Sequence, residues 1–144
     1  MEQKRIADAL VRKCRSRDPF RIAEAMGFDI VRLPLKGIRG YYQYMKRCKL
    51  IYIDSSLSEP DARFVCAHEL GHAFLHQGSN RIFMDTHTHF VSSRFETQAN
   101  RFAVDLLFGD DDIMDFLEQP IQVTADCLGI PMDLAVYRLS TIRR

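Results

Sequence analysis

The sequence predicts an α+β fold in which a small, largely antiparallel sheet packs against helices and a C-terminal helix pair closes the chain. Segments with an apolar residue every three or four positions indicate amphipathic helices in both halves. Short runs rich in tyrosine and isoleucine, which favour strands, fall between residues 28 and 53. With 144 residues, 47% of them hydrophobic, the chain is expected to form a single domain over residues 1–144.

The first elements are two helices and a strand. Residues 3–15 carry apolar side chains at helical spacing. Asp18-Pro19 is typical of an N-cap followed by a first-turn proline, and Gly27 is expected to end that helix. Residues 28–33 alternate apolar and polar side chains, which predicts a strand.

Two more strands are predicted at residues 38–45 and 50–53, joined by a basic turn at 46–49. Ser58 and Asp61 have the spacing of a capping box, which predicts a helix from there to about residue 76. Residues 78–92 are expected to form a loop that can include a short strand at 81–84.

The second half is predicted to be helical. Ser93 and Glu96 form a second capping-box pattern, so a helix is expected from there to about residue 108. The acidic run at 110–112 caps a short helix. Residues 121–142 form two helices broken at Gly129-Ile130-Pro131.

Composition excludes several classes of protein. No window approaches the ~18 uninterrupted apolar residues of a membrane helix, and the N-terminus has no signal-peptide core. The four cysteines form no C-x-x-C pair, which argues against a disulfide framework or a cysteine zinc finger. A soluble cytoplasmic protein is therefore expected.

The chemical signal is the H-E-x-x-H motif of His68, Glu69 and His72. Histidines four positions apart share one helical face, where both imidazoles can reach one metal ion. Glu69 lies beside the pair and can address a water on that ion, whose pKa zinc lowers to about 7. A surface helix that bears these residues by chance is the alternative, but the apolar residues around the motif predict a buried helix.

A catalytic zinc needs a third protein ligand and an open position. The downstream candidates are His76, Asp85, His87, His89, Glu96 and Asp105. Glu96 is favoured because it starts a helix whose inner face can meet the motif helix; its alternative role is only to close the capping box. Asn100 shares the face of Glu96 and can support a ligand through a hydrogen bond.

Two segments together resemble a known family. Cys66 to His76, with the core HELGH, is followed by Glu96 to Leu107, which reads ETQANRFAVDLL. This order resembles the ImmA/IrrE family of bacterial and phage metallopeptidases, in which HELGH is paired with a downstream helix of the form E-x-[EQ]-A-[ND]-x-F-A-x-x-L-L. Position 98 is Gln where many members have Glu. The resemblance extends more loosely over both flanks and so covers most of the chain.

The resemblance implies a zincin-like fold and a gluzincin-like site. His68, His72 and Glu96 would be ligands of Zn²⁺, with Mn²⁺ as the alternative ion, and Glu69 would be the general base. It also implies an endopeptidase that cleaves a helix-turn-helix repressor encoded beside it on a prophage or mobile element, which relieves repression.

Two other functions remain open. In the first, the chain is a non-catalytic repressor-docking module whose structural zinc has His76, His87 or His89 as a fourth ligand. His87 and His89 are also candidates for stabilising an oxyanion. In the second, the C-terminal pair reads DNA; its last helix carries only one basic residue, Arg138, which argues against direct nucleic-acid binding and favours packing or partner docking.

Overall fold

The computed structural model describes residues 2–76 and 93–143. The predicted strand at 81–84 and the candidates Asp85, His87 and His89 lie outside these ranges. The elements of the first range are α1 (Glu2–Cys14), α2 (Pro19–Ala25), β1 (Phe28–Leu33), β2 (Gly40–Met45), β3 (Cys48–Asp54) and α3 (Glu59–Leu75). Those of the second are α5 (Ser93–Leu107), α6 (Asp110–Ile113), a 3₁₀ helix (Met114–Glu118), α7 (Ile121–Leu128) and α8 (Met132–Ser140).

The α+β class is confirmed, but one strand pairing differs from the prediction. The sheet has the order β1-β3-β2; β2 and β3 are antiparallel, whereas β1 pairs in parallel with β3. Lys46 and Arg47 make the hairpin turn with φ of 51° and 66°, as a tight two-residue turn requires. The longer connection at 34–39 lets β3 take the central position, so the sheet is mixed rather than largely antiparallel.

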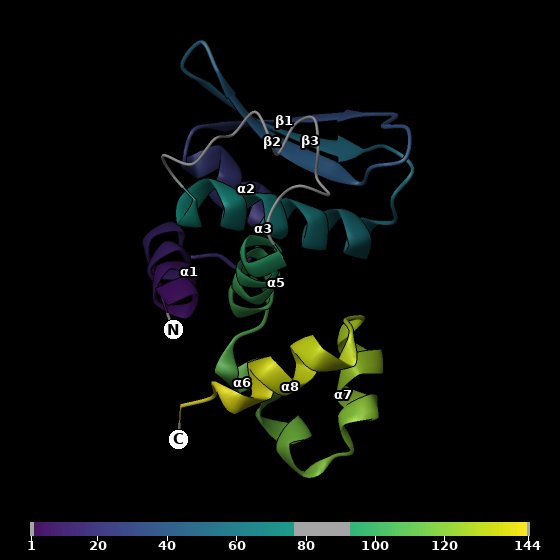
Figure 1. Ribbon diagram of the computed structural model, residues 1–144. Helices are drawn as coiled ribbons and strands as arrows, with labels where there is room; N and C mark the ends of the chain where they lie inside the picture. The colour runs from purple at the N-terminus through teal and green to yellow at the C-terminus, as the bar shows by residue number, and fades with distance from the viewer. Residues whose placement is uncertain (1, 77–92, 144) are drawn as a thin grey trace.

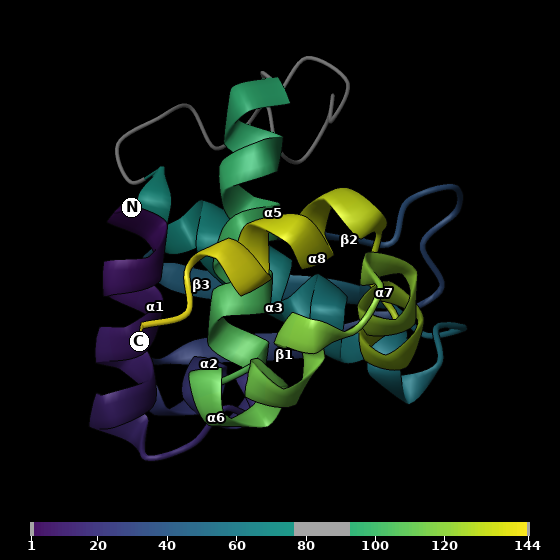
Figure 2. The same cartoon turned by 90° about the horizontal axis from the view of Figure 1, so that it is seen from below.

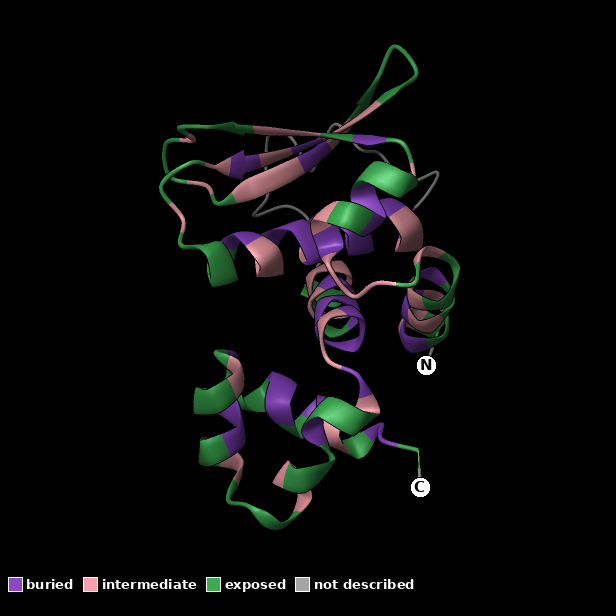
Figure 3. Ribbon diagram, turned by 180° about the vertical axis from the view of Figure 1, so that it is seen from behind, coloured by how far each residue is buried: buried purple, intermediate pink, exposed green. Residues whose placement is uncertain are grey.

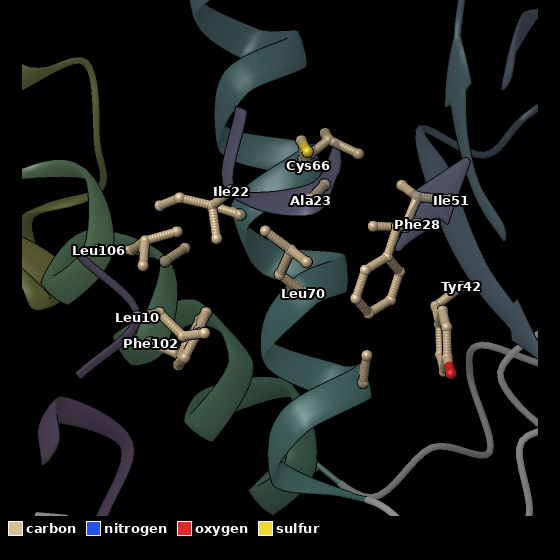
Figure 4. Close-up of a cluster of buried hydrophobic side chains, with 14 of the residues drawn as sticks. Leu10, Ile22, Ala23, Phe28, Tyr42, Ile51, Cys66, Leu70, Phe102 and Leu106 are labelled. Carbon is tan, nitrogen blue, oxygen red and sulfur yellow. The ribbon is translucent and has the colours of Figure 1, made fainter. Parts of the chain in front are cut away.

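The layers stack on α3. Figure 1 shows the sheet above α3, with α1 and α5 below it and α6–α8 farthest from the sheet. The predicted cap of α3 is confirmed, because the Ser58 hydroxyl accepts a hydrogen bond from the Asp61 amide at 3.3 Å. Since α3 lies between two layers, both of its faces are buried, and Leu70 packs between the sheet and α5 (Figure 4). The main core includes Ile22, Phe28, Ile51, Leu70, Phe102 and Leu106.

A second, smaller core attaches the C-terminal helices to α5. Figure 2 shows α8 lying across α5, and Figure 3 marks the buried stretches of these helices in purple. It comprises Val104, Ala125, Ile130, Leu134, Ala135 and Tyr137. The Tyr137 hydroxyl donates to the buried Asp105 carboxylate at 2.6 Å. Arg138 is only 1% exposed and donates to the Phe108 carbonyl and, at 2.6 Å, to Asp110. The one basic side chain of α8 is thus used in internal packing.

Candidate metal centre

His68 and His72 lie one turn apart on α3, and their Nε2 atoms are 3.1 Å apart. His72 is 3% exposed. Two imidazoles this close inside a protein need a shared partner for their ring nitrogens, because an unpaired buried polar group costs roughly 1–3 kcal/mol. The motif helix is buried, as predicted.

Glu96, in the first turn of α5, supplies that partner. Its Oε1 atom is 2.7 Å from Nε2 of His72, and its Oε2 atom is 3.2 Å from Nε2 of His68. The three side chains bring one donor atom each within 4.8 Å of one another. An ion with tetrahedral bonds of ~2.0–2.1 Å spaces its ligand atoms by roughly 3.3 Å, so these residues fit a zinc-type ion. Glu96 faces the histidines rather than only capping its helix.

The close approach of α3 and α5 is what brings Glu96 to the histidines. Gly71 lies at the crossing, where a Cβ atom would be 3.1 Å from the Ala99 Cα atom and 3.2 Å from the Ala99 carbonyl oxygen. Glycine at position 71 therefore sets the spacing of the two helices, and with it the distance from Glu96 to the two histidines.

Glu69 is near this group but outside it. Its Oε2 atom is 4.0 Å from Nε2 of His68, and its side chain is 8% exposed. The backbone of Tyr42 in β2 provides a hydrogen bond to its carboxylate. Burial raises the pKa of Glu69, although the neighbouring His68 and His72 oppose the change. A carboxyl whose proton affinity is raised in this way is suited to general-base and general-acid chemistry.

Charge pairing dominates the remaining electrostatics. Burial alone would lower the pKa of His68, but its hydrogen bond to Glu96 and the charges of Glu69 and Glu96 raise it overall. Burial would raise the pKa of Glu96, and its hydrogen bonds to His68 and His72 outweigh this and hold it far below the usual range. Glu96 is therefore ionised at neutral pH.

His76 and Gln98 extend the group on the far side of His72. The Nδ1 atoms of His72 and His76 are 3.2 Å apart, and Nε2 of His76 is 3.0 Å from Oε1 of Gln98. His76 is 5% exposed, and its ring stacks on Phe95 with centroids 4.0 Å apart. Because His76 contacts the opposite nitrogen of His72 from the one that faces Glu96, this arrangement does not make it a fourth ligand.

Sequence reasoning missed this link. His76 continues the histidine stripe of α3, but Gln98 lies two positions from Glu96, and residues two apart on a helix point in nearly opposite directions. The other described candidate, Asp105, is fully buried against Tyr137 and Arg138, so it takes no part in the site.

An open cavity of about 330 Å³ leads to the three donor atoms. His68, Glu69, His72, Glu96, Asn100, Phe64 and residues 37–41 line its described part. A larger groove of about 860 Å³ adjoins it, since Arg39, Phe64 and Asn100 line both. The groove runs between the N-terminal end of α3 and the α7–α8 connection.

The sequence pattern of one peptidase family, described as the IrrE N-terminal-like domain, matches residues 23–140. The chain belongs to this family. It is 36% identical over 129 residues to an uncharacterized immunity region protein 2 of Bacillus phage phi105, covering 88% of this chain and 82% of that one. It is 28% identical over 129 residues to the metallopeptidase ImmA of Bacillus subtilis strain 168, covering 85% and 75%.

A solved structure supports the fold of this family member. A Mycobacterium tuberculosis transcriptional regulator superposes with a TM-score of 0.59 at 18% identity, over 99% of this chain and 47% of that longer chain. Within the described residues, no helix has both the length and the apolar character needed to cross a membrane.

Proposed function

We propose that this chain is a zinc-dependent endopeptidase, with Mn²⁺ as the alternative ion. The observation that carries the proposal is the convergence of His68, His72 and Glu96, with Glu69 next to them but outside the donor group. Membership of a peptidase family supports the same reaction. A divalent ion held by these three side chains supplies a Lewis acid that polarises the scissile carbonyl and lowers the pKa of a water.

The remaining steps fall to residues of the chain. Glu69 accepts a proton from the attacking water, since its carboxylate faces the cavity and its pKa is raised by burial. Once protonated, Glu69 donates that proton to the amine that leaves when the peptide bond breaks. The Tyr42 backbone keeps the carboxylate oriented through both transfers.

The proposed substrate is a helix-turn-helix repressor encoded beside the chain in a prophage or mobile element. One relative is named for a phage immunity region and another as the metallopeptidase ImmA, which supports a role connected with repression. The groove that adjoins the cavity offers room for residues of a polypeptide substrate beyond the scissile bond.

The test compares the parent with Glu69→Gln. Because the amide cannot accept a proton, cleavage of the neighbouring repressor should fall by at least ~10²-fold, while bound zinc and association with the repressor stay at parental levels. Gel electrophoresis follows cleavage, and pull-down follows association. Cleavage by Glu69→Gln at the parental rate would refute the role of Glu69.

A metal measurement separates the enzyme from a docking module. Replacing His68, His72 or Glu96 with Ala should each lower zinc content, which is expected to be about one ion per chain. Association without cleavage by the zinc-loaded parent would favour the docking module. Unchanged zinc affinity in Glu96→Ala would refute Glu96 as the third ligand.

A further inference from the structure

The second nitrogen of His72 has a chemical role that follows from the proposed metal site. A neutral imidazole that binds a metal through Nε2 must carry its proton on Nδ1. In this chain the partner of Nδ1 is another imidazole, that of His76, rather than a carboxylate or a carbonyl. An imidazole nitrogen can donate or accept, so His76 alone does not decide which nitrogen of His72 is protonated.

The hydrogen-bond partner of His76, Gln98, therefore determines which nitrogen is protonated. We propose that His76 and Gln98 are a positioning pair that selects the tautomer of His72, and that the amide of Gln98 makes the selection reversible. This inference rests on the proposed metal site, with His72 as a ligand. It assigns a role to a contact chain that runs from His72 through His76 to Gln98, with separations of 3.2 Å and 3.0 Å.

If a metal ion is bound to Nε2 of His72, only one assignment of protons to the ring nitrogens of His72 and His76 is possible. Nδ1–H of His72 donates to Nδ1 of His76. His76 must then carry its own proton on Nε2, and this N–H donates to Oε1 of Gln98. Every ring nitrogen of His72 and His76 then has a partner, and both imidazoles and the Gln98 amide are neutral.

Without metal, a neutral His72 can carry its proton on Nε2 instead of Nδ1, and the donor and acceptor of the contact with His76 are then exchanged. Its Nε2–H then donates to Glu96, 2.7 Å away, and its Nδ1 accepts from Nδ1–H of His76. Nε2 of His76 then acts as an acceptor and requires a donor. The side-chain NH₂ of Gln98 provides one after its terminal amide rotates by half a turn, whereas a carboxylate at position 98 could only accept.

Burial makes this choice of residue matter. His72 and His76 are 3% and 5% exposed, so both rings are shielded from bulk water. Glutamate at position 98 would favour only the arrangement in which Nε2 of His76 carries the proton, and an apolar residue there would give Nε2 of His76 no hydrogen bond from position 98. Because partners of metal-bound histidines change metal affinity by about 10- to 100-fold, the identity of residue 98 should tune binding of the ion.

The experiment measures zinc affinity of the metal-free protein by competition with a chromophoric chelator. Gln98→Glu should bind zinc at least ~10-fold more tightly than the parent, and Gln98→Leu at least ~10-fold more weakly. Thr97→Glu is the matched control: it adds the same charge at the neighbouring exposed position of α5, and should change affinity much less. Equal affinities for parent and Gln98→Glu, or an equal gain in Thr97→Glu, would overturn the inference.

A second measurement reads the tautomer directly. Nitrogen-15 NMR of the imidazoles, recorded in alkaline buffer where unbound imidazoles are neutral, should place the His76 proton on Nδ1 without zinc and on Nε2 with zinc. In Gln98→Glu the proton should stay on Nε2 in both states. A His76 tautomer that does not respond to zinc in the parent overturns the reversible pair. Failure of the parent to bind zinc at all would instead overturn the proposed metal site, and this inference with it.

Discussion

Replacing Gly71 with alanine tests whether the crossing of α3 and α5 is as tight as the structure shows. The added Cβ atom would lie 3.1 Å from the Ala99 Cα atom, 3.2 Å from the Ala99 carbonyl oxygen and 3.1 Å from Cδ1 of Phe102. Two of these neighbours are backbone atoms and cannot rotate away. Phe102 is fully buried, so its ring has no empty space to enter.

Two opposing terms set the magnitude. Alanine is favoured over glycine inside a helix by up to about 1 kcal/mol. Overpacking a well-filled interface costs typically about 1–3 kcal/mol. Because backbone atoms form most of the contact, the larger cost is expected, and Gly71→Ala should lower the free energy of unfolding by about 1–2 kcal/mol. The helices relieve the contact by moving apart by a few tenths of an ångström, which also draws Glu96 away from His68 and His72.

Urea denaturation of the metal-free protein gives the stability change, and a chelator competition gives zinc affinity. Gly71→Ala should be less stable and should bind zinc more weakly. Thr97→Ala, at an exposed position of α5, is the control and should stay within about 0.5 kcal/mol of the parent. A Gly71→Ala protein at least as stable as the parent, with unchanged zinc affinity, would refute the argument that position 71 sets the helix spacing.

Three further predictions concern other parts of the chain. Burial raises the pKa of Asp105 to about 6 from 3.8, so the folded state holds this proton more tightly than the unfolded chain does. Parental stability should therefore fall by about 3 kcal/mol, relative to Asp105→Asn, as pH rises from ~3 to ~7; a difference in urea-denaturation free energy that is constant over this window would contradict it. Gly129 has φ of 69°, and a Cβ atom added there would meet nothing within 4 Å, so Gly129→Ala should cost about 1 kcal/mol through backbone strain alone, and an unchanged denaturation midpoint would show that the turn adapts. Zinc at 100 times its dissociation constant should stabilise the parent by about 2.7 kcal/mol, and equal stabilisation of His68→Ala would place the ion elsewhere.

The helices and strands could be predicted because their signals are local. The Asp18 and Ser58 caps depend on residues within three positions, and both are present in the structure. The direction of β1 could not be obtained in this way. Alternation of apolar residues shows that Phe28–Leu33 is a strand, but contains no information on whether its neighbour runs parallel or antiparallel. That depends on β3 taking the central position.

Part of the candidate site could also be predicted from local sequence, and part could not. The spacing of His68 and His72 is sufficient to place both imidazoles together, because one helical turn separates them. The position of Glu96 beside the histidines could be predicted only with the second sequence motif, because it depends on how α5 crosses α3. The contact between His76 and Gln98 could not be predicted from the sequence. It joins the C-terminal end of α3 to a position of α5 that does not share the face of Glu96.

The distribution of the three donors over two helices gives the site a hierarchy of assembly. His68 and His72 form a two-donor unit whenever α3 is helical, whatever the rest of the chain does. Glu96 joins them only when α5 is packed across Gly71. In the proposed site, the third bond to an ion would therefore depend on tertiary structure and the first two on secondary structure. If the proposed site is correct, full coordination and the chemistry that depends on it are properties of the folded chain alone, and a partly folded molecule would hold an ion only weakly and would not cleave a peptide bond.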